Sequence, residues 1–275
     1  MARTPVDTEA VLKKLQEMYP DAKCALHHRN AFELLVATVL SAQCTDARVN
    51  IVTARIFPRY NRPEHFAALS VEEIGEMIRD CGLWRNKAKN IQALSRMLLE
   101  KYGGEVPSTL EELTQLPGVG RKTANVVLSN AFGIPAIAVD THVFRVANRL
   151  GLADAQTPEE TERQLMERIP REYWSQAHHW LIHHGRQICH ARNPQCSQCP
   201  LLPHCRYGRQ VGPRMGRRAS GLQPAAGTPR ASGRRTRTAA QSAAAGPAGG
   251  PARRAGRRRT AQPGQGQSEG SAEPG

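Results

Sequence analysis

The chain has 275 residues, a length that suits one large domain or two small ones. Lysine and arginine outnumber aspartate and glutamate by 38 to 24, and the formal net charge of +14 favours a polyanionic partner, nucleic acid first. Residues 206–275 hold fourteen arginines and two glutamates, so +12 of this charge lies there and only +2 in residues 1–205. We expect neither a membrane span of about 20 apolar residues nor a secretory signal.

Residues 1–205 carry repeated helix signals and no sustained alternation of β-branched residues, which predicts an all-α fold of about ten helices. Polar caps and capping boxes mark the expected starts of several helices. These signals are Asn30 before 31–40, Ser70 with Glu73 before 71–81, Ser108 with Glu111 before 110–116, and Thr157 with Pro158 and Glu160 before 160–169. Gly103 and Gly104 suit a left-handed cap after the helix expected over 85–102.

The composition changes after Cys205, and Gly, Ala, Pro and Arg dominate residues 209–275. Such a segment cannot bury enough apolar surface to offset its chain entropy, so we expect a disordered tail. The tail is either an Arg-rich arm that binds phosphates without sequence preference, or a solvated segment of biased composition, including an out-of-frame extension of a GC-rich gene.

The sequence LPGVG at 116–120 predicts a tight turn followed at once by a helix. Pro117 sets φ for the first central residue of the turn, and Gly118 permits a positive φ at the second. Gly120 then opens the helix without a side chain. The free amides and the dipole of that helix would form an anion seat that a nucleic-acid backbone could approach closely. An ordinary turn between two helices explains LPGVG equally.

Arg121 and Lys122 lie in the first turn of this helix, where the dipole disfavours cations. An amine is a nucleophile only when it is deprotonated. The charge of Arg121, the helix end and a partly dry cleft would all favour loss of a proton from Lys122. The alternative is an exposed lysine that reaches solvent or a phosphate.

Four of the seven cysteines follow the spacing C-x6-C-x2-C-x5-C, and they are Cys189, Cys196, Cys199 and Cys205. Four thiolates within seventeen residues would converge on one tetrahedral site, either zinc or an iron–sulfur cluster. The other reading is four unrelated buried cysteines. His179 and His183 lie one turn apart on an expected helix, but no glutamate stands between them as in a metalloprotease helix. We interpret these histidines as packing and hydrogen-bonding residues.

The segments LPGVGRKTANVVLSNAFG (116–133) and AVDTHVFRVANRLGL (138–152) resemble the helix–hairpin–helix and the following segment of the endonuclease III family. That family belongs to the helix–hairpin–helix DNA glycosylase superfamily, and the similarity covers about residues 5–208. The resemblance implies a fold of two helical lobes with a DNA-binding cleft between them.

The implied boundaries are residues 24–134 for a six-helix barrel that ends in the hairpin, and residues 1–23 with 135–208 for a lobe around a cluster. The disordered tail would then occupy residues 209–275.

The resemblance also assigns roles to two residues in the cleft. Lys122 stands at the position of the catalytic lysine, which attacks the anomeric carbon of the sugar, expels the base and forms a Schiff base before β-elimination cuts the strand. Asp140 matches the catalytic aspartate and also fits the N-cap of a helix over 141–150. The two roles are compatible, because a capping carboxylate facing the cleft could help to deprotonate Lys122 or stabilise the cationic sugar.

Six residues are candidates for DNA contacts, and they are Gln43, Leu83, Gly118, Gly120, Arg145 and Arg192. Gln43 in SAQCTD and Leu83 in GLWRNKAKNI match family residues that fill the space left by a flipped nucleotide. From the residues alone, a leucine such as Leu83 is more often a core residue, and a glutamine such as Gln43 is more often a polar loop residue.

The charged candidates can also be explained without a role in the site. Arg145 is similar in position to a phosphate-contacting arginine, or it is an ordinary surface residue. Arg192 lies in the cysteine loop, which presents basic groups to DNA in the family. Lys87 and Lys89 are either part of a solvated face or phosphate contacts. Asp46 matches an acidic position near the pocket, or it caps a helix that starts after Thr45.

The cysteine spacing matches the [4Fe–4S] loop of the family, so the resemblance implies a [4Fe–4S] cluster that fixes this loop and takes no assigned part in the glycosylase chemistry. It also implies damaged double-stranded DNA as the partner, no membrane, a monomer, and a cytoplasmic, nucleoid-associated location in a bacterium.

Adenine-specific relatives lack the lysine at position 122 and carry a glutamate in the segment aligned with SAQCTD. This chain has the lysine and lacks that glutamate, so we expect a bifunctional DNA glycosylase and abasic-site lyase that acts on oxidised pyrimidines. The alternatives are a glycosylase for another lesion such as an oxidised purine, a non-enzymatic helix–hairpin–helix DNA-binding protein, and a zinc-loaded DNA-binding protein.

Overall fold

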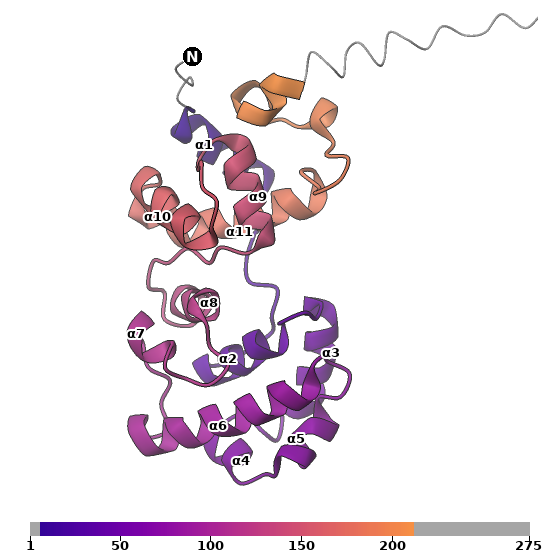
Figure 1. The fold of residues 1–275 in the computed structure, drawn as a ribbon, viewed down its shortest axis with the longest axis vertical. Coiled ribbons are helices and arrows are strands. Elements are labelled where there is room, and N and C mark those ends of the chain that lie inside the picture. Colours follow the sequence, from indigo (N-terminus) through magenta and orange to yellow (C-terminus); the bar gives the residue numbers. More distant parts are fainter. Residues whose placement is uncertain (1–5, 212–275) are drawn as a thin grey trace, which may run out of the picture. The chain divides into compact units, whose positions relative to one another are not determined.

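The computed structural model describes residues 6–211, and every regular element in that range is a helix (Figure 1). The all-α fold predicted from the sequence is therefore confirmed for this part of the chain. Eleven α-helices and three short 3-10 helices follow one another in this range, before a last helical stretch over residues 206–211. Their bounds are α1 Thr8–Met18, α2 Ala31–Leu40, α3 Asp46–Ile56, α4 Pro63–Ala67, α5 Val71–Met77, α6 Trp84–Tyr102, α7 Leu110–Leu113, α8 Arg121–Ala131, α9 Thr141–Leu150, α10 Pro158–Arg168, η1 Arg171–Tyr173, α11 Trp174–Gln187, η2 Cys196–Gln198 and η3 Leu202–His204.

The end of the described range differs slightly from expectation. Residues 206–211 are helical, so the chain is still regular at position 209, where the tail was expected to begin. The rest of the predicted tail, residues 212–275, lies outside the described residues. Within residues 6–211, no helix is both long enough and apolar enough to cross a lipid bilayer.

The buried apolar side chains form two separate cores. The first core joins α2–α8 and contains fully buried residues such as Leu34 and Phe66. The second joins α1 to α9–α11, and Leu15 and Leu181 are among its fully buried members. Figure 1 shows the same division, with α1 beside α9 and α11 and away from α2, which follows it in the chain. Each fully buried leucine contributes about 1.5–3 kcal/mol, so this burial explains why α1 packs with the C-terminal helices.

The helix starts follow the predicted caps closely, with two corrections. Asn30 and Ser70 cap α2 and α5, and Ser70 forms the predicted capping box with Glu73. The cap of α7 is Thr109 and not Ser108, because the Thr109 side chain accepts a hydrogen bond from the Glu112 backbone at 3.2 Å. The Glu112 carboxylate accepts from the Thr109 hydroxyl at 2.7 Å and not from the backbone, so the cap moves by one residue and the reciprocal bond of the expected box is replaced by a side-chain contact.

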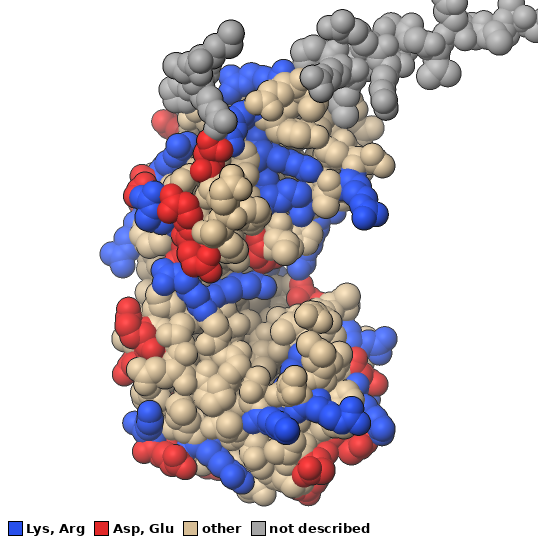
Figure 2. All heavy atoms as spheres, in the orientation of Figure 1, with Lys and Arg blue, Asp and Glu red and all other residues tan. Residues whose placement is uncertain are grey.

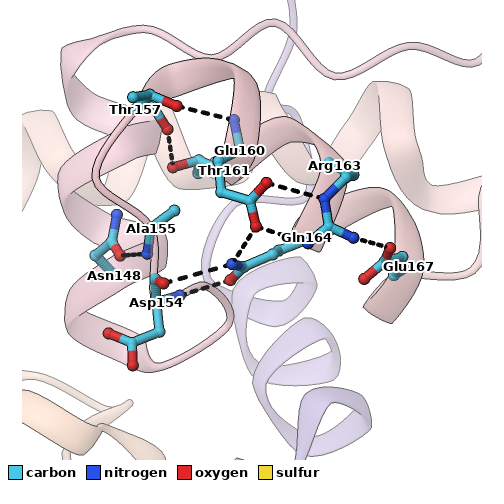
Figure 3. A network of polar contacts seen from close by, with 9 residues as sticks. All are labelled: Asn148, Asp154, Ala155, Thr157, Glu160, Thr161, Arg163, Gln164 and Glu167. Atoms are coloured by element: carbon cyan, nitrogen blue, oxygen red, sulfur yellow. Dashed lines mark hydrogen bonds and ion pairs between the residues drawn. The ribbon is translucent and has the colours of Figure 1, made fainter.

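The start of α10 shows the second correction. Thr157 caps the helix as predicted, and its hydroxyl accepts from the Glu160 backbone N–H at 3.2 Å. The Glu160 carboxylate, however, accepts hydrogen bonds from Arg163 and Gln164 (Figure 3). Because Arg163 and Gln164 on the next turn bind this carboxylate, it does not fold back to the Thr157 backbone N–H as a capping box requires. A network of side chains along the helix takes the place of that bond.

The connection between α8 and α9 positions the residues of interest. The Asn125 side-chain amide, buried in α8, donates to the Ile137 carbonyl at 3.0 Å. This bond fixes the extended segment that leads into α9 against the body of α8. The first turns of α8 and α9 are thereby held in a defined relationship, although nineteen residues separate Arg121 from Asp140 in the chain.

Candidate active site

The turn before α8 has the geometry that its sequence predicts. The Val119 N–H donates to the Leu116 carbonyl at 3.0 Å, and Gly118 has φ = 78°. A Cβ at Gly118 would also lie 2.6 Å from the Asn90 side-chain nitrogen, so both conformation and space require glycine there. Gly120 is the N-cap of α8 and has no heavy atom within 4 Å of the position that a Cβ would take. The backbone at the start of α8 is therefore open to a large anion.

Lys122 is the second residue of α8, and its side chain is exposed. Arg121 takes a partner that the sequence did not suggest. Its guanidinium makes a bidentate ion pair with Glu162 of α10, with N···O distances of 2.9 and 2.8 Å. The expected effect of Arg121 on Lys122 is therefore weakened, because this charge is already balanced by a carboxylate that is only 5% exposed.

Asp140 is the N-cap of α9, as predicted. Its Oδ1 accepts hydrogen bonds from the His142 and Val143 backbone N–H groups, both at 2.8 Å. Since both bonds end on the same oxygen, capping the helix leaves the second oxygen of the carboxylate free to take another role.

Lys122 and Asp140 line one cleft whose walls also include helices of both cores. The empty space within it, part of which is open solvent, measures about 620 Å³. Figure 2 shows that the surface is hollowed between the two groups of helices, with Lys and Arg side chains gathered above the hollow. The structure thus brings together the two residues that the sequence proposed for the chemistry.

A salt bridge joins two walls of this cleft. Arg186 of α11 contacts the Asp46 carboxylate of α3 with an N···O distance of 2.8 Å. Asp46 is the first helical residue of α3, and the helix cap is Thr45, whose hydroxyl accepts from the Arg48 backbone. The capping role considered for Asp46 is therefore wrong, and its place on the cleft wall agrees with the resemblance.

Two buried histidines of α11 also line the cleft. Burial lowers the pKa of His178 to about 4 and that of His179 to about 3, so both side chains are neutral near pH 7. His179 Nε2 lies 2.9 Å from the Asn130 side-chain oxygen. Within residues 6–211, no three His, Cys, Asp or Glu side chains converge on a position for a single metal ion. The hydrogen bond of His179 agrees with the packing role expected for it.

Gln43 and Leu83 share an unusual backbone conformation for residues that are not glycine. Their φ values are 52° and 59°, in the left-handed region, where a side chain costs about 1–2 kcal/mol. Leu83 is 55% exposed, which excludes the core role considered for it. A Cβ on the neighbouring Gly82 would lie 3.5 Å from the Gln43 carbonyl oxygen, so the two loops lie close together. Gln43 is likewise exposed.

The residue after Leu83 explains how this loop is held. The ring of Trp84 lies 2.7 and 2.9 Å from the position that a Cβ would take at Gly75 of α5. The guanidinium groups of Arg79 and Arg85 lie 5.9 and 4.3 Å from the centre of the same ring. Trp84 is therefore fixed at the base of the exposed Leu83.

The structure excludes both roles considered for Lys87, which were a place on a solvated face and a contact to phosphate. It is 4% exposed, and its Nζ donates to the Leu40 carbonyl at the end of α2 at 2.8 Å. Burial lowers the pKa of this ammonium. Lys87 thus ties α6 to the start of the loop that carries Gln43 and does not reach solvent or DNA. Its position between polar neighbours in the sequence gave no indication of this burial.

Arg145 has mainly internal partners. Its Nε donates to the Cys189 carbonyl at 3.1 Å, and its Nη2 donates to the Gly185 carbonyl at 3.0 Å. A further bond, from Nη1, reaches Thr141 at 3.3 Å. Arg145 therefore links α9 to the cysteine loop, which the sequence reasoning did not foresee. The DNA contact expected for this residue stays a prediction.

A second arginine of α9 donates to the cysteine loop, and one arginine of the loop itself is exposed. Arg149 donates to the His190 carbonyl at 2.6 Å and to the Cys189 sulfur at 3.5 Å. Only its last-turn position in α9 distinguishes it in the sequence, so sequence reasoning missed it. Arg192 is exposed, as a residue that contacts DNA must be.

The four cysteines of the predicted cluster line one space, which Leu150, Ile188 and Leu202 also line, and its empty volume of about 320 Å³ includes open solvent. Burial raises the pKa of Cys196 and Cys205, and it raises that of Cys199 to about 11, with the neighbouring cysteines as a further cause. Thiolates at these positions therefore need a cationic group among them. The four cysteines line one largely apolar space, and an iron–sulfur cluster, which carries iron cations and takes four thiolates, fits this set of donors.

Comparison with known proteins agrees with this geometry. Residues 36–171 match the HhH-GPD superfamily of base excision DNA repair proteins, and residues 189–205 match the iron–sulfur binding domain of endonuclease III. Endonuclease III of Bacillus subtilis is 56% identical over 203 residues, which are 74% of this chain and 93% of that protein. Endonuclease III of Escherichia coli K12 is 46% identical over 201 residues, which are 73% of this chain and 95% of that protein.

A solved structure is similar along the same part of the chain. A trapped covalent intermediate of endonuclease III with DNA superposes with a TM-score of 0.71 at 55% identity, covering 75% of this chain and 96% of that chain. Since the relatives are matched over nearly their full lengths, the resemblance found in the hairpin and cysteine motifs extends to the whole fold. The chain belongs to the endonuclease III family.

Proposed function

We propose that Lys122 is the nucleophile, and Asp140 its partner, in the removal of oxidised pyrimidines from duplex DNA. The chain is a DNA glycosylase with abasic-site lyase activity, and it binds DNA. The observation that carries the residue assignment is that Lys122 and Asp140 line the same cleft from the first turns of two different helices. The covalent DNA intermediate of the solved relative supports a nucleophilic residue.

The chemistry can be written with these two side chains. The neutral Lys122 amine attacks C1′ of a flipped nucleotide, the glycosidic bond breaks, and the base leaves with the bonding electrons and takes up a proton. Loss of the ring oxygen bond gives a Schiff base between Lys122 and the sugar. Removal of a C2′ proton then expels the 3′ phosphate by β-elimination, and water releases the enzyme. The Asp140 oxygen that does not cap α9 accepts the Lys122 proton or stabilises the cationic sugar.

DNA would be held by the open backbone and by the two exposed loops. Gly118 and Gly120 would bring the amides at the start of α8 to a phosphate. Gln43 and Leu83 would enter the space that the flipped nucleotide leaves, which their exposure and mutual proximity support. Arg192 would contact the backbone from the cysteine loop, and Arg145 would do so with any donor that its internal bonds leave.

The chain holds a [4Fe–4S] cluster, and we assign its ligands to Cys189, Cys196, Cys199 and Cys205. Bound there, the cluster supplies a fixed redox-active cross-link. The protein's part is to supply four thiolates and to orient the loop that they hold, so that Arg192 faces outward.

We also propose that the two cores correspond to lobes of residues 24–134 and of 1–23 with 135–208, followed by a separate tail that starts beyond the helical residues 206–211 and not at 209. The protein would act as a monomer in the cytoplasm, where a bacterial chromosome lies.

The experiment that tests the substrate compares base release from duplexes with a single thymine glycol or a single 8-oxoguanine. We expect release of thymine glycol by the wild type. Release of 8-oxoguanine alone would favour the oxidised-purine alternative, and tight binding of both duplexes without release would favour a non-enzymatic protein.

Asp140→Asn should slow release far more than it weakens duplex binding.

A further inference from the structure

A polar pair next to the cysteine site has no part in the chemistry above. His184 of α11 is 1% exposed, and its side chain lines the space that the four cysteines surround. His184 Nε2 lies 3.7 Å from Cys199 Sγ, and His184 Nδ1 lies 3.1 Å from the Tyr19 hydroxyl. Tyr19 ends α1 and is 7% exposed, so the series Tyr19–His184–Cys199 is largely shielded from water.

The direction of these hydrogen bonds follows from the ligand. A coordinated thiolate has no proton to donate, so the bond to Cys199 requires a proton on His184 Nε2. The other ring nitrogen meets Tyr19, whose hydroxyl adjusts its own proton to the state of the ring. Tyr19 thereby fixes the orientation of the ring and supports the tautomer that donates to sulfur.

Packing alone does not explain these residues. Two apolar rings would fill the same volume, whereas a buried hydroxyl and imidazole cost free energy unless each finds a partner. Within residues 6–211, the Tyr19 hydroxyl and both ring nitrogens of His184 find their hydrogen-bond partners in this series. The backbone of His184 adds a second link, because its carbonyl accepts from the Cys189 N–H at 2.8 Å. One residue thus contacts two of the four proposed ligands.

We propose that His184, held by Tyr19, is a positioning residue that donates an N–H···S hydrogen bond to Cys199 and so raises the reduction potential of the cluster. The physical reason is that such a bond stabilises added negative charge on the ligand sulfur, and hydrogen bonds to cluster sulfurs are among the factors that set the potential. This inference rests on the proposed assignment of Cys199 as a ligand.

The test measures the midpoint potential of the cluster in the full-length protein by film voltammetry, together with the Fe–S(Cys) stretching frequencies by resonance Raman. His184→Phe removes the donor and keeps a ring, and we expect a more negative potential. Tyr19→Phe removes only the hydroxyl, and we expect a smaller shift in the same direction. Tyr207→Phe is the matched control, since Tyr207 lines the same space and stacks on Arg149 with its ring, so its potential should match the wild type.

Potentials equal to the wild type in both His184→Phe and Tyr19→Phe, with full clusters, would overturn the proposal. If His184→Phe cannot hold a cluster, the Tyr19→Phe potential decides: a negative shift supports the hydrogen bond and no shift refutes it. Cys199→Ser separates this inference from the ligand assignment. A wild-type cluster spectrum in Cys199→Ser would refute the assignment and the inference together, whereas an altered spectrum with unmoved potentials in the other variants would refute the inference alone.

Discussion

Arg145 and Cys189 are joined by a 3.1 Å hydrogen bond from the guanidinium Nε to the backbone carbonyl. The bond connects the helix that Asp140 caps to the first cysteine of the proposed cluster. The same guanidinium reaches the Gly185 carbonyl near the end of α11. These hydrogen bonds join the start of α9 to the cysteine loop, so we expect a change in the conformation of one to alter the other.

We therefore expect Arg145→Met to lower the free energy of unfolding by about 1–3 kcal/mol, because it leaves carbonyl acceptors without their charged donor. The measurement is urea unfolding followed by helical circular dichroism and by cluster absorbance. Arg145→Lys should recover only part of the loss, since one ammonium cannot reproduce a planar fork. An unfolding midpoint unchanged in both variants would show that the link carries no stability.

Arg192 should behave in the opposite way, since it is exposed. Arg192→Ala should leave the unfolding free energy within about 0.5 kcal/mol of the wild type. It should weaken binding to all duplexes alike and reduce the slope of log K against log salt by about 1, as expected for one lost phosphate contact. Binding of lesion-free duplex over a salt series measures this slope, and an unchanged slope would remove Arg192 from the DNA interface.

Gly75→Ala should shift Leu83 indirectly, by displacing the neighbouring Trp84. The new Cβ would lie 2.7 Å from a Trp84 ring carbon, so the ring has to move, and the loop that carries Leu83 moves with it. We expect base release from a paired lesion to fall by about tenfold, corresponding to ~1.4 kcal/mol. Cleavage of a preformed abasic site in single-stranded DNA, which needs no wedge, should be unchanged.

The double variant Gly75→Ala/Trp84→Phe is the control for this experiment, because the smaller ring restores space for the methyl group. It should recover part of the lost release. Equal loss on paired and single-stranded substrates would instead mean that Gly75→Ala damages the protein generally.

Stability should fall in acid partly because of His178 and His179. Their folded-state pKa values, about 4 and about 3, lie below the ordinary value of 6.5. A depressed pKa contributes stability that is fully present above pH 6.5 and is lost as the pH falls toward the folded value, by at most about 1.4 kcal/mol per pH unit and per histidine.

His179→Gln keeps an amide near Asn130 and removes one titration. Urea unfolding between pH 7 and pH 4.5 should give a shallower pH dependence for this variant than for the wild type. Parallel curves would mean that His179 gains its proton without cost in the folded protein.

Local sequence signals predicted the helices and the turn at Gly118 well, because caps, turn glycines and apolar periodicity act within a few residues. The shift from Ser108 to Thr109 shows their limit, since two adjacent residues could both cap. The pairing of Arg121 with Glu162 and the burial of Lys87 depend on elements distant in the chain, and a pattern of charges does not specify which partner a long side chain finds.

The candidate site divides in the same way. Lys122, Asp140 and the four cysteines could be named because their types and spacing carry the chemistry. Arg149, Tyr19 and His184 could not, because their importance comes only from contacts made through the fold: Tyr19 and His184 are 165 positions apart. Leu83 needed the structure as well, since only its exposure distinguishes a wedge from a core residue.

Borohydride trapping shows whether Lys122 forms a covalent bond to the sugar of the damaged nucleotide. The substrate is a duplex with a single thymine glycol, and the proteins are the wild type and Lys122→Ala, with Lys89→Ala, which removes an exposed lysine of α6, as the control. We predict a covalent protein–DNA adduct for the wild type and Lys89→Ala, and no adduct for Lys122→Ala with duplex binding retained. An adduct that persists in Lys122→Ala, or active base release by the wild type without any adduct, would rule out Lys122 as the covalent nucleophile.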